Sequence, residues 1–179
     1  ESGDLECCYS DNRYLQLLHP QLMAAENEEQ LSQCLRVFRR REMIRIVWRD
    51  FTRQASMIET ARDATLLAEA CINGALDILH PLSCLQMGTP TSHNGEEQRL
   101  VVIAMGKMGA HELNISSDID LIFAYPESGQ TEGGERSISN QEFFVRLGQK
   151  LIAALDRQTE DGFVFRVDMR LRPYGQSGA

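Results

Sequence analysis

The sequence lacks an uninterrupted apolar run of about 18 residues, the length that a membrane-spanning helix needs. It also shows no signal peptide and no lipidation motif. We therefore expect a cytoplasmic protein with no membrane partner. An initiator methionine is missing as well, because the chain begins at Glu1 and stops at Ala179. We expect the chain to be a fragment of a longer protein.

The cysteines lack the spacing of a metal site or a disulfide set. Five are present, namely Cys7, Cys8, Cys34, Cys71 and Cys84. An odd number without a CxxC pair indicates reduced thiols, as in a cytosolic protein. An excess of basic residues is also lacking, since the formal net charge is −8. This charge argues against a general nucleic-acid binder, whose domain is normally basic.

Several familiar motifs are absent. The stretch Gly106-Lys107-Met108-Gly109 lacks the GxxxxGK[ST] run of a P-loop ATPase. His111-Glu112 is not followed by the second histidine of a zinc protease. No Asp-x-Asp-x-Asp-Gly loop is present, which excludes an EF-hand. The sequence also shows no internal repeat, so a solenoid is not indicated.

The first part of the chain is predicted to be helical. Apolar residues recur at helical spacing after Asn27 and again after Asp63, and we expect both residues to be N-caps. Pro81 is expected to end or kink the second of these helices. Trp48 lies on an apolar helical stripe that also contains Met43, and we expect it in the core.

Four arginines crowd one part of the helical region: Arg36, Arg39, Arg40 and Arg41. Two interpretations are open. The cluster is a solvated face whose arginines pair with acids and lay their aliphatic stems on apolar surface. Alternatively, it is a docking patch for a partner.

Residues 88–98 are rich in Gly, Pro, Ser and Thr and are predicted to be a linker. We therefore divide the chain into a helical region, residues 1–95, and a catalytic core, residues 96–179. The apolar run Leu100–Met105 predicts a central, buried strand. Residues 126–136 are predicted to be a mobile loop. A capping box at Ser139 and Glu142 then predicts a helix from Asn140 to about Arg157.

The core opens on glycines and two carboxylates. Gly106 and Gly109 allow backbone N–H groups to approach phosphate oxygens, and Lys107 adds a positive charge. Asp118 and Asp120 open the next strand, where alternation points both carboxylates to one face. Such a pair suits Mg²⁺, although a turn cap and a solvated acid are the plainer interpretation of a lone Asp-x-Asp.

A third carboxylate favours the metal interpretation. Residues 163–172 alternate strictly, which predicts a strand with Val164, Arg166, Asp168, Arg170 and Arg172 on its polar face. If this strand lies beside the Asp118/Asp120 strand, three carboxylates and three arginines share one surface. Metal-dependent nucleotidyl transfer needs such an arrangement, with acids for two cations and arginines for phosphate oxygens.

These motifs resemble the nucleotidyltransferase superfamily of the DNA polymerase β-like fold. The longer strings around Gly106, Asp118 and Asp168 resemble, more specifically, the family of bifunctional glutamine synthetase adenylyltransferase/adenylyl-removing enzymes. Residues 109–117 look more like the N-terminal, adenylyl-removing half of such an enzyme. The resemblance implies a mixed α+β fold, with a nucleotidyltransferase core after an N-terminal helical region.

The resemblance also implies roles for single residues. Two Mg²⁺ ions are held by Asp118, Asp120 and Asp168, which are the catalytic residues. Phosphate and nucleotide are bound by Gly106, Lys107, Gly109, Ser117, Arg166, Arg170 and Arg172.

The implied reaction is phosphorolysis of the AMP–tyrosine bond on adenylylated glutamine synthetase, which gives ADP. The implied regulators are the PII signal protein and glutamine. The alternatives are ATP-dependent adenylylation of the same tyrosine, a silent nucleotide- or protein-binding module, and a metal-dependent glycosyltransferase.

Overall fold

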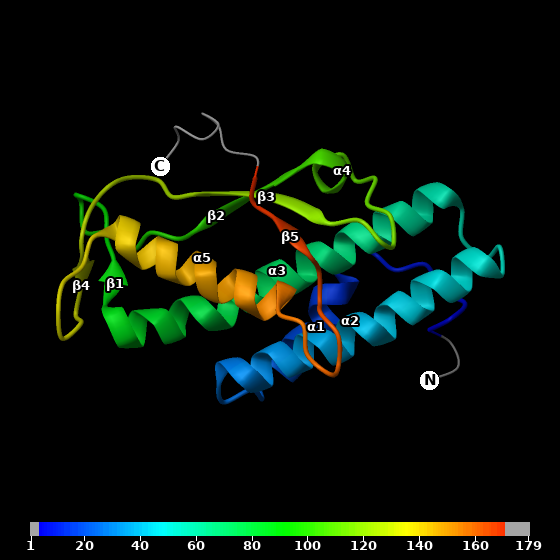
Figure 1. Cartoon of the computed structure of the whole chain (residues 1–179), viewed down its shortest axis with the longest axis horizontal. Coiled ribbons are helices and arrows are strands. Elements are labelled where there is room, and N and C mark those ends of the chain that lie inside the picture. The colour runs from blue at the N-terminus through cyan, green and yellow to red at the C-terminus, as the bar shows by residue number, and fades with distance from the viewer. Residues whose placement is uncertain (1–3, 171–179) are drawn as a thin grey trace.

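The computed structural model describes residues 4–170 and shows an α+β protein, as predicted (Figure 1). Its elements in chain order are α1 (Arg13–Leu22), α2 (Glu28–Phe51), α3 (Met57–Met87), β1 (Thr89–Pro90), β2 (Val101–Met105), α4 (Gly106–Gly109), β3 (Ile119–Ala124), β4 (Thr131–Glu132), α5 (Asn140–Asp156) and β5 (Val167–Asp168). No helix within residues 4–170 is both long and apolar enough to cross a membrane.

The long helix α3 is the centre of the helical layer, and α1, α2 and α5 all pack against it. A three-stranded sheet with the order β2-β3-β5 lies over α3 and α5 (Figure 1). Phe123 of β3 lies against Gly148 of α5, where there is no room for a side chain. The backbone N–H of Leu113 donates to Oγ1 of Thr65 in α3 at 3.3 Å. The helices therefore form the floor on which the sheet rests.

The predicted starts of two helices are confirmed. Oδ1 of Asn27 accepts hydrogen bonds from the backbone N–H groups of Glu29 and Gln30, at 3.1 and 2.9 Å, and so caps α2. Oγ of Ser139 accepts from the N–H of Glu142 at 3.1 Å and caps α5. These side chains satisfy donors that the first turn of a helix leaves without partners.

The predicted start of α3 at Asp63 is wrong. The N-cap is Ser56, whose Oγ accepts from the N–H of Glu59 at 3.2 Å, and Asp63 lies about two turns inside the helix. Pro81 also does not end this helix, which continues to Met87. Packing of α3 on three other helices outweighs the one backbone hydrogen bond that a proline cannot donate.

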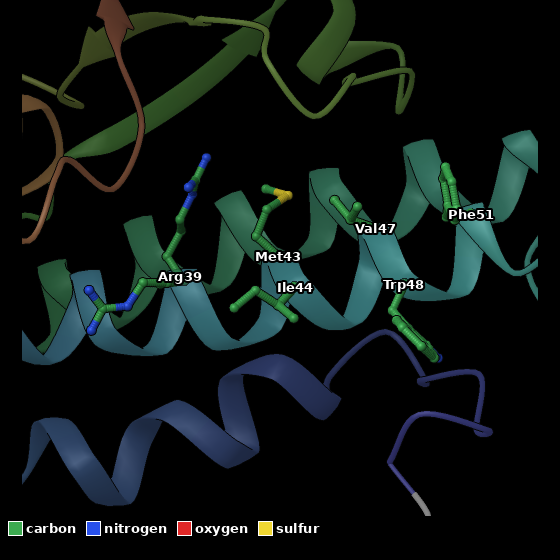
Figure 2. A pocket seen from close by; sticks show the side chains of 7 residues that line it. Arg39, Met43, Ile44, Val47, Trp48 and Phe51 are labelled. Atoms are coloured by element: carbon green, nitrogen blue, oxygen red, sulfur yellow. The ribbon is translucent and has the colours of Figure 1, made fainter.

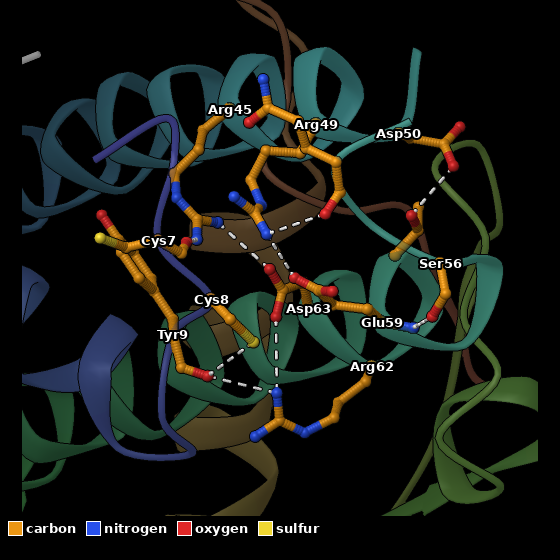
Figure 3. Close-up of polar contacts among 12 residues, drawn as sticks. Cys7, Cys8, Tyr9, Arg45, Arg49, Asp50, Ser56, Glu59, Arg62 and Asp63 are labelled. Carbon is orange, nitrogen blue, oxygen red and sulfur yellow. Dashed lines mark hydrogen bonds and ion pairs between the residues drawn. The ribbon is translucent and has the colours of Figure 1, made fainter. Parts of the chain in front are cut away.

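A buried polar network joins α2, α3 and the N-terminal segment (Figure 3). Arg45, which is only 4% exposed, donates to Oδ2 of Asp63 at 3.1 Å. It also donates to the backbone carbonyls of Asp4 and Cys7, at 2.9 and 2.6 Å. One guanidinium thus holds two helices and the segment before α1 together.

This network changes the expected buried face in the second half of α2, although Met43 is buried as expected. The buried face carries Arg45 and Arg49, because acids of α3 neutralise them. The prediction that Trp48 lies in the core is wrong, since 51% of it is exposed. Trp48 lines an open groove of about 380 Å³ on α2 with Arg39, Arg40, Met43, Ile44, Val47 and Phe51 (Figure 2).

The arginine cluster fits the first of its two interpretations in part, since Arg40 and Arg41 are exposed and paired with acids, whereas Arg36 is buried with only 7% of it exposed. Arg40 pairs with Asp161 at 3.4 Å, and Arg41 pairs with Asp4 at 3.2 Å. Arg39 lies over the ring of Phe165, at 5.6 Å from its centroid. Burial lowers the pKa of Arg39.

The structure differs from the expectations for the two loops and for the first strand of the core. The linker 88–98 and the loop 126–136 are not wholly irregular, since β1 and β4 pair with each other. The expectation that Leu100–Met105 forms a central, buried strand is wrong. Among the strands of residues 4–170, β2 pairs with β3 alone and so lies at the sheet edge. Its alternate side chains, on the face turned away from the helices, are exposed.

The buried network predicts the result of removing one partner. We expect Asp63→Ala to lower the free energy of unfolding by roughly 3–5 kcal/mol, because it leaves the Arg45 charge buried without its acid. Urea unfolding followed by circular dichroism measures this difference.

The matched control is Arg146→Ala, which removes the exposed pair between Arg146 and Glu142. It should cost only about 0.3–0.5 kcal/mol, as exposed pairs four residues apart in a helix do. Equal losses in the two variants would show that the buried Arg45–Asp63 pair contributes no more to the free energy of unfolding than an exposed pair does.

Candidate active site

The candidate site begins where β2 turns through α4. Met105, the last residue of β2, lies opposite Asp120 of β3 in the antiparallel register. Gly106 follows with a φ of +56°, a backbone conformation that L side chains rarely adopt. A Cβ at Gly106 would collide with the Asp120 carboxylate. The glycine therefore allows this acid to lie directly against the backbone of the turn.

The pairing of β3 with β5 brings the third carboxylate to the first two. These strands are parallel, with Asp120 opposite Asp168, and the N–H of Ile119 donates to the carbonyl of Arg166 at 2.9 Å. Directly opposed residues of neighbouring strands point to the same face, and their strands lie about 4.8 Å apart. The predicted neighbourhood of the two acid-bearing strands is thus confirmed.

The orientation of β3 determines on which face of the sheet the acids lie. Ile119 and Leu121 are buried in the core, so the residues between and before them, Asp120 and Asp118, point outward. Asp118 precedes the first residue of β3 by one position. The sheet therefore presents three acids on the side away from the helices.

Two of the acids are held by arginines. Nε of Arg166 lies 2.6 Å from Oδ1 of Asp118, and the same guanidinium donates to the carbonyl of Ser116 at 3.0 Å. Nε of Arg170 donates to Oδ1 of Asp168 at 2.9 Å, and the N–H of Arg170 donates to the same oxygen. These bonds lower the pKa of Asp168 to about 2. Its carboxylate is therefore ionised at neutral pH.

The electrostatics link all three acids. The bond to Asp168 raises the pKa of Arg170, and the charges of Asp118 and Asp120 raise it further. One exposed guanidinium thus lies in the field of three carboxylates. The cation offsets repulsion between acids that the strand register holds close together.

The turn before β3 is ordered by its own side chains. Oγ of Ser117 donates to Oδ1 of Asn114 at 2.5 Å. Nζ of Lys107 lies 3.5 Å from the same Oγ, at the limit of a hydrogen bond. Lys107 and Ser117 are therefore neighbours beside the acids, as the sequence interpretation requires. Asn114 and Ser117 are residue types that suit a turn before the acid strand, and their hydrogen bond forms such a turn here.

The donor set suits a hard divalent cation, since carboxylate oxygens are the ligands that Mg²⁺ prefers. As the side chains lie, however, no group of three or more His, Cys, Asp or Glu in residues 4–170 is close enough to hold a metal ion. The ion pairs explain this arrangement, because Asp118 and Asp168 are turned toward their arginines. Both arginines lie on exposed surface, so they can exchange partners without leaving a buried charge.

The predicted strand 163–172 is shorter than its alternation suggests. Within residues 163–170, only Val167 and Asp168 pair with β3, and Val164, expected on the polar face, is fully buried. The N–H groups of Val164 and Phe165 both donate to the carbonyl of Leu155 at the end of α5. This connection turns the backbone before the strand begins. Arg172 lies outside the described residues.

Gly106 provides a test of this geometry. We expect Gly106→Ala to destabilise the chain more than Gly95→Ala does. Both glycines have positive φ, so each change costs about 1–2 kcal/mol in backbone strain. A Cβ at Gly95 meets nothing within 4 Å, whereas at Gly106 it displaces Asp120. Urea unfolding measures both variants, and equal losses would contradict the close approach of Asp120.

Comparison with known proteins identifies the family of this chain. The family model described as Glutamate-ammonia ligase adenylyltransferase matches residues 2–179. The chain is 57% identical over 179 residues to a bifunctional glutamine synthetase adenylyltransferase/adenylyl-removing enzyme of Pseudomonas aeruginosa. It is 54% identical over 178 residues to the protein of that name in Nitrosococcus oceani.

Both alignments cover 99% of this chain but only 18% of the relative. The chain thus spans about a fifth of the length of the curated relatives that it matches. Because the family model covers nearly every residue, the chain belongs to the glutamate-ammonia ligase adenylyltransferase family.

Proposed function

We propose that this chain carries a nucleotidyl-transfer site that removes AMP from a tyrosine of glutamine synthetase. The observation that carries the proposal is the register of β3 and β5, which places Asp168 beside Asp120 on the face that Asp118 shares. The names of the relatives support glutamine synthetase as the protein substrate. The catalytic part is residues 96–179, and residues 1–95 are its helical support.

The three aspartates would hold two Mg²⁺ ions. When bound, such a pair stabilises the attacking and leaving oxygens of an in-line displacement at phosphorus. Asp120 is suited to a central position, because it lies opposite Asp168 and two residues from Asp118. The low pKa of Asp168 keeps this ligand ionised.

The arginines and Lys107 would bind the phosphate groups. Arg166 and Arg170 neutralise Asp118 and Asp168 in the structure, and they become available to phosphate oxygens when the acids take other partners. Arginine suits this exchange, since its planar fork matches carboxylate and phosphate oxygens equally well. Gly106, Gly109, Ser117 and Arg172 complete the proposed phosphate and nucleotide contacts.

The proposed reaction breaks one phosphorus–oxygen bond and forms another. An oxygen of inorganic phosphate attacks the α-phosphorus of the AMP–tyrosine ester. The bond from that phosphorus to the tyrosine oxygen breaks, and the phenolate takes up a proton. The products are ADP and unmodified tyrosine. Positioning and charge stabilisation by the site residues account for the catalysis, because phosphoryl chemistry needs no covalent intermediate on the protein.

The relatives carry two activities in one polypeptide, as their name states. The same donor set serves ATP-dependent adenylylation, so that reaction is the alternative. We assign removal to this chain because residues 109–117 resemble the adenylyl-removing half. The proposal includes the cytoplasm as its location and the PII signal protein as a regulator.

The assignment predicts the effect of Asp120→Asn in the full-length protein that contains this chain. We expect ADP production from adenylylated glutamine synthetase, phosphate and Mg²⁺ to fall by roughly a thousandfold or more, as loss of a central charge-stabilising group does. Adenylylation of unmodified glutamine synthetase with ATP should persist, because the proposed site for it lies elsewhere in the polypeptide.

The control is Asp161→Asn, the same change at an exposed acid in the turn before β5. It should leave both reactions intact. Loss of the ATP-dependent reaction alone in Asp120→Asn would establish the alternative direction. Retention of both reactions would show that this chain is a binding module.

A further inference from the structure

A strip of apolar side chains extends from the acids along the outer face of the sheet. Val101, Ile103 and Met105 of β2 alternate outward and are 47%, 43% and 37% exposed. Ile122 of β3 lies opposite Ile103 and so shares this face. These four residues, here called the β2 strip, take no part in the hydrophobic core, although Val102, Ala104 and Phe123 on the other face do.

The β2 strip is continuous with the candidate active site. Its last residue, Met105, lies directly opposite Asp120 in the register. From there the strip runs back to Val101, a length of about 14 Å at the rise of an extended strand. The surface near the acids thus has two different sides. Arg166 and Arg170 lie toward β5, and the apolar side chains of the strip lie toward β2, with Lys107 just past the end of the strip.

We propose that the β2 strip binds the polypeptide that flanks the reacting tyrosine of the protein substrate. The inference rests on the proposed function and deepens it. A tyrosine can reach the acids only if the residues next to it cross the surrounding surface. The cationic side suits the phosphate groups, which leaves the apolar side for an uncharged, extended segment.

The backbone of β2 adds to this surface. Among the strands of residues 4–170, β2 has β3 as its only neighbour, so its outer edge carries backbone groups without strand partners. An extended peptide binds such an edge through main-chain hydrogen bonds, and its alternate side chains contact the adjoining face. A strip several residues long beside a free edge fits a peptide segment better than a single nucleobase.

The test compares two substrates in the full-length protein. One is adenylylated glutamine synthetase, and the other is free O-adenylyl-tyrosine, which has no flanking polypeptide. We expect Ile103→Lys to lower the ratio of kcat/KM for the protein substrate to kcat/KM for the small substrate by roughly tenfold or more. Val101→Lys should act in the same direction. Both side chains are half exposed, so a lysine stem fits without unfolding the strand.

The matched control is Val145→Lys on α5, where Val145 is 53% exposed. Its ratio should equal that of the unchanged protein, and thermal unfolding verifies that all three variants are folded. An unchanged ratio in Ile103→Lys and Val101→Lys overturns the inference, whether the strip serves the nucleotide or is covered by another segment of the same polypeptide. A different result, no turnover of either substrate by the unchanged protein, refutes the proposed function itself.

Discussion

The parallel pairing of β3 with β5 is the constraint on which the site depends. It requires only two residue pairs, and one of them places Asp168 beside Asp120. A shift of one residue would turn Asp168 to the helical side of the sheet, because neighbouring residues of a strand face opposite ways. The short strand is held in register by the three residues just before it. Arg166 contributes its carbonyl to Ile119, and α5 receives the N–H groups of Val164 and Phe165 at its last turn.

The helical layer fixes the position of this register in the molecule. Arg45 joins α2, α3 and the N-terminal segment through one buried guanidinium, and α3 in turn supports both α5 and the turn before β3. The backbone N–H of Leu113 donates to Thr65 of α3. Leu113 directly precedes the turn at Asn114–Ser117 that leads into the acid-bearing strand. The first half of the chain thus has no acids at the site, yet it supports the strands that present them.

Features that depend on neighbouring residues in the sequence, including the acids of the site, were predicted better than the packing between helices. Caps at Asn27 and Ser139 depend on neighbouring residues alone, and the sequence predicts them correctly. The common face of Asp118, Asp120 and Asp168 follows from alternation and from the family resemblance. The buried position of Asp63 could not be predicted, because its partner Arg45 comes from another helix. Trp48 was misplaced for the same reason, since the arginines that take the buried face of α2 need acids that only the fold supplies. The apolar run of β2 predicts a buried strand, but its alternate side chains lie on the exposed face of the sheet.

The ion pairs of the site show how three acids are tolerated on one sheet face before a ligand binds. Carboxylates so close together repel one another, and desolvation by a substrate would strengthen that repulsion. Arg166 and Arg170 lower this cost while both remain on exposed surface, so each arginine can leave its carboxylate without becoming a buried, unpaired charge. In the proposed reaction, the same two side chains would then carry positive charge to the phosphate oxygens. Cations that neutralise the acids in one state and the nucleotide in the next give a site that is stable when free and complementary to an anionic ligand when occupied.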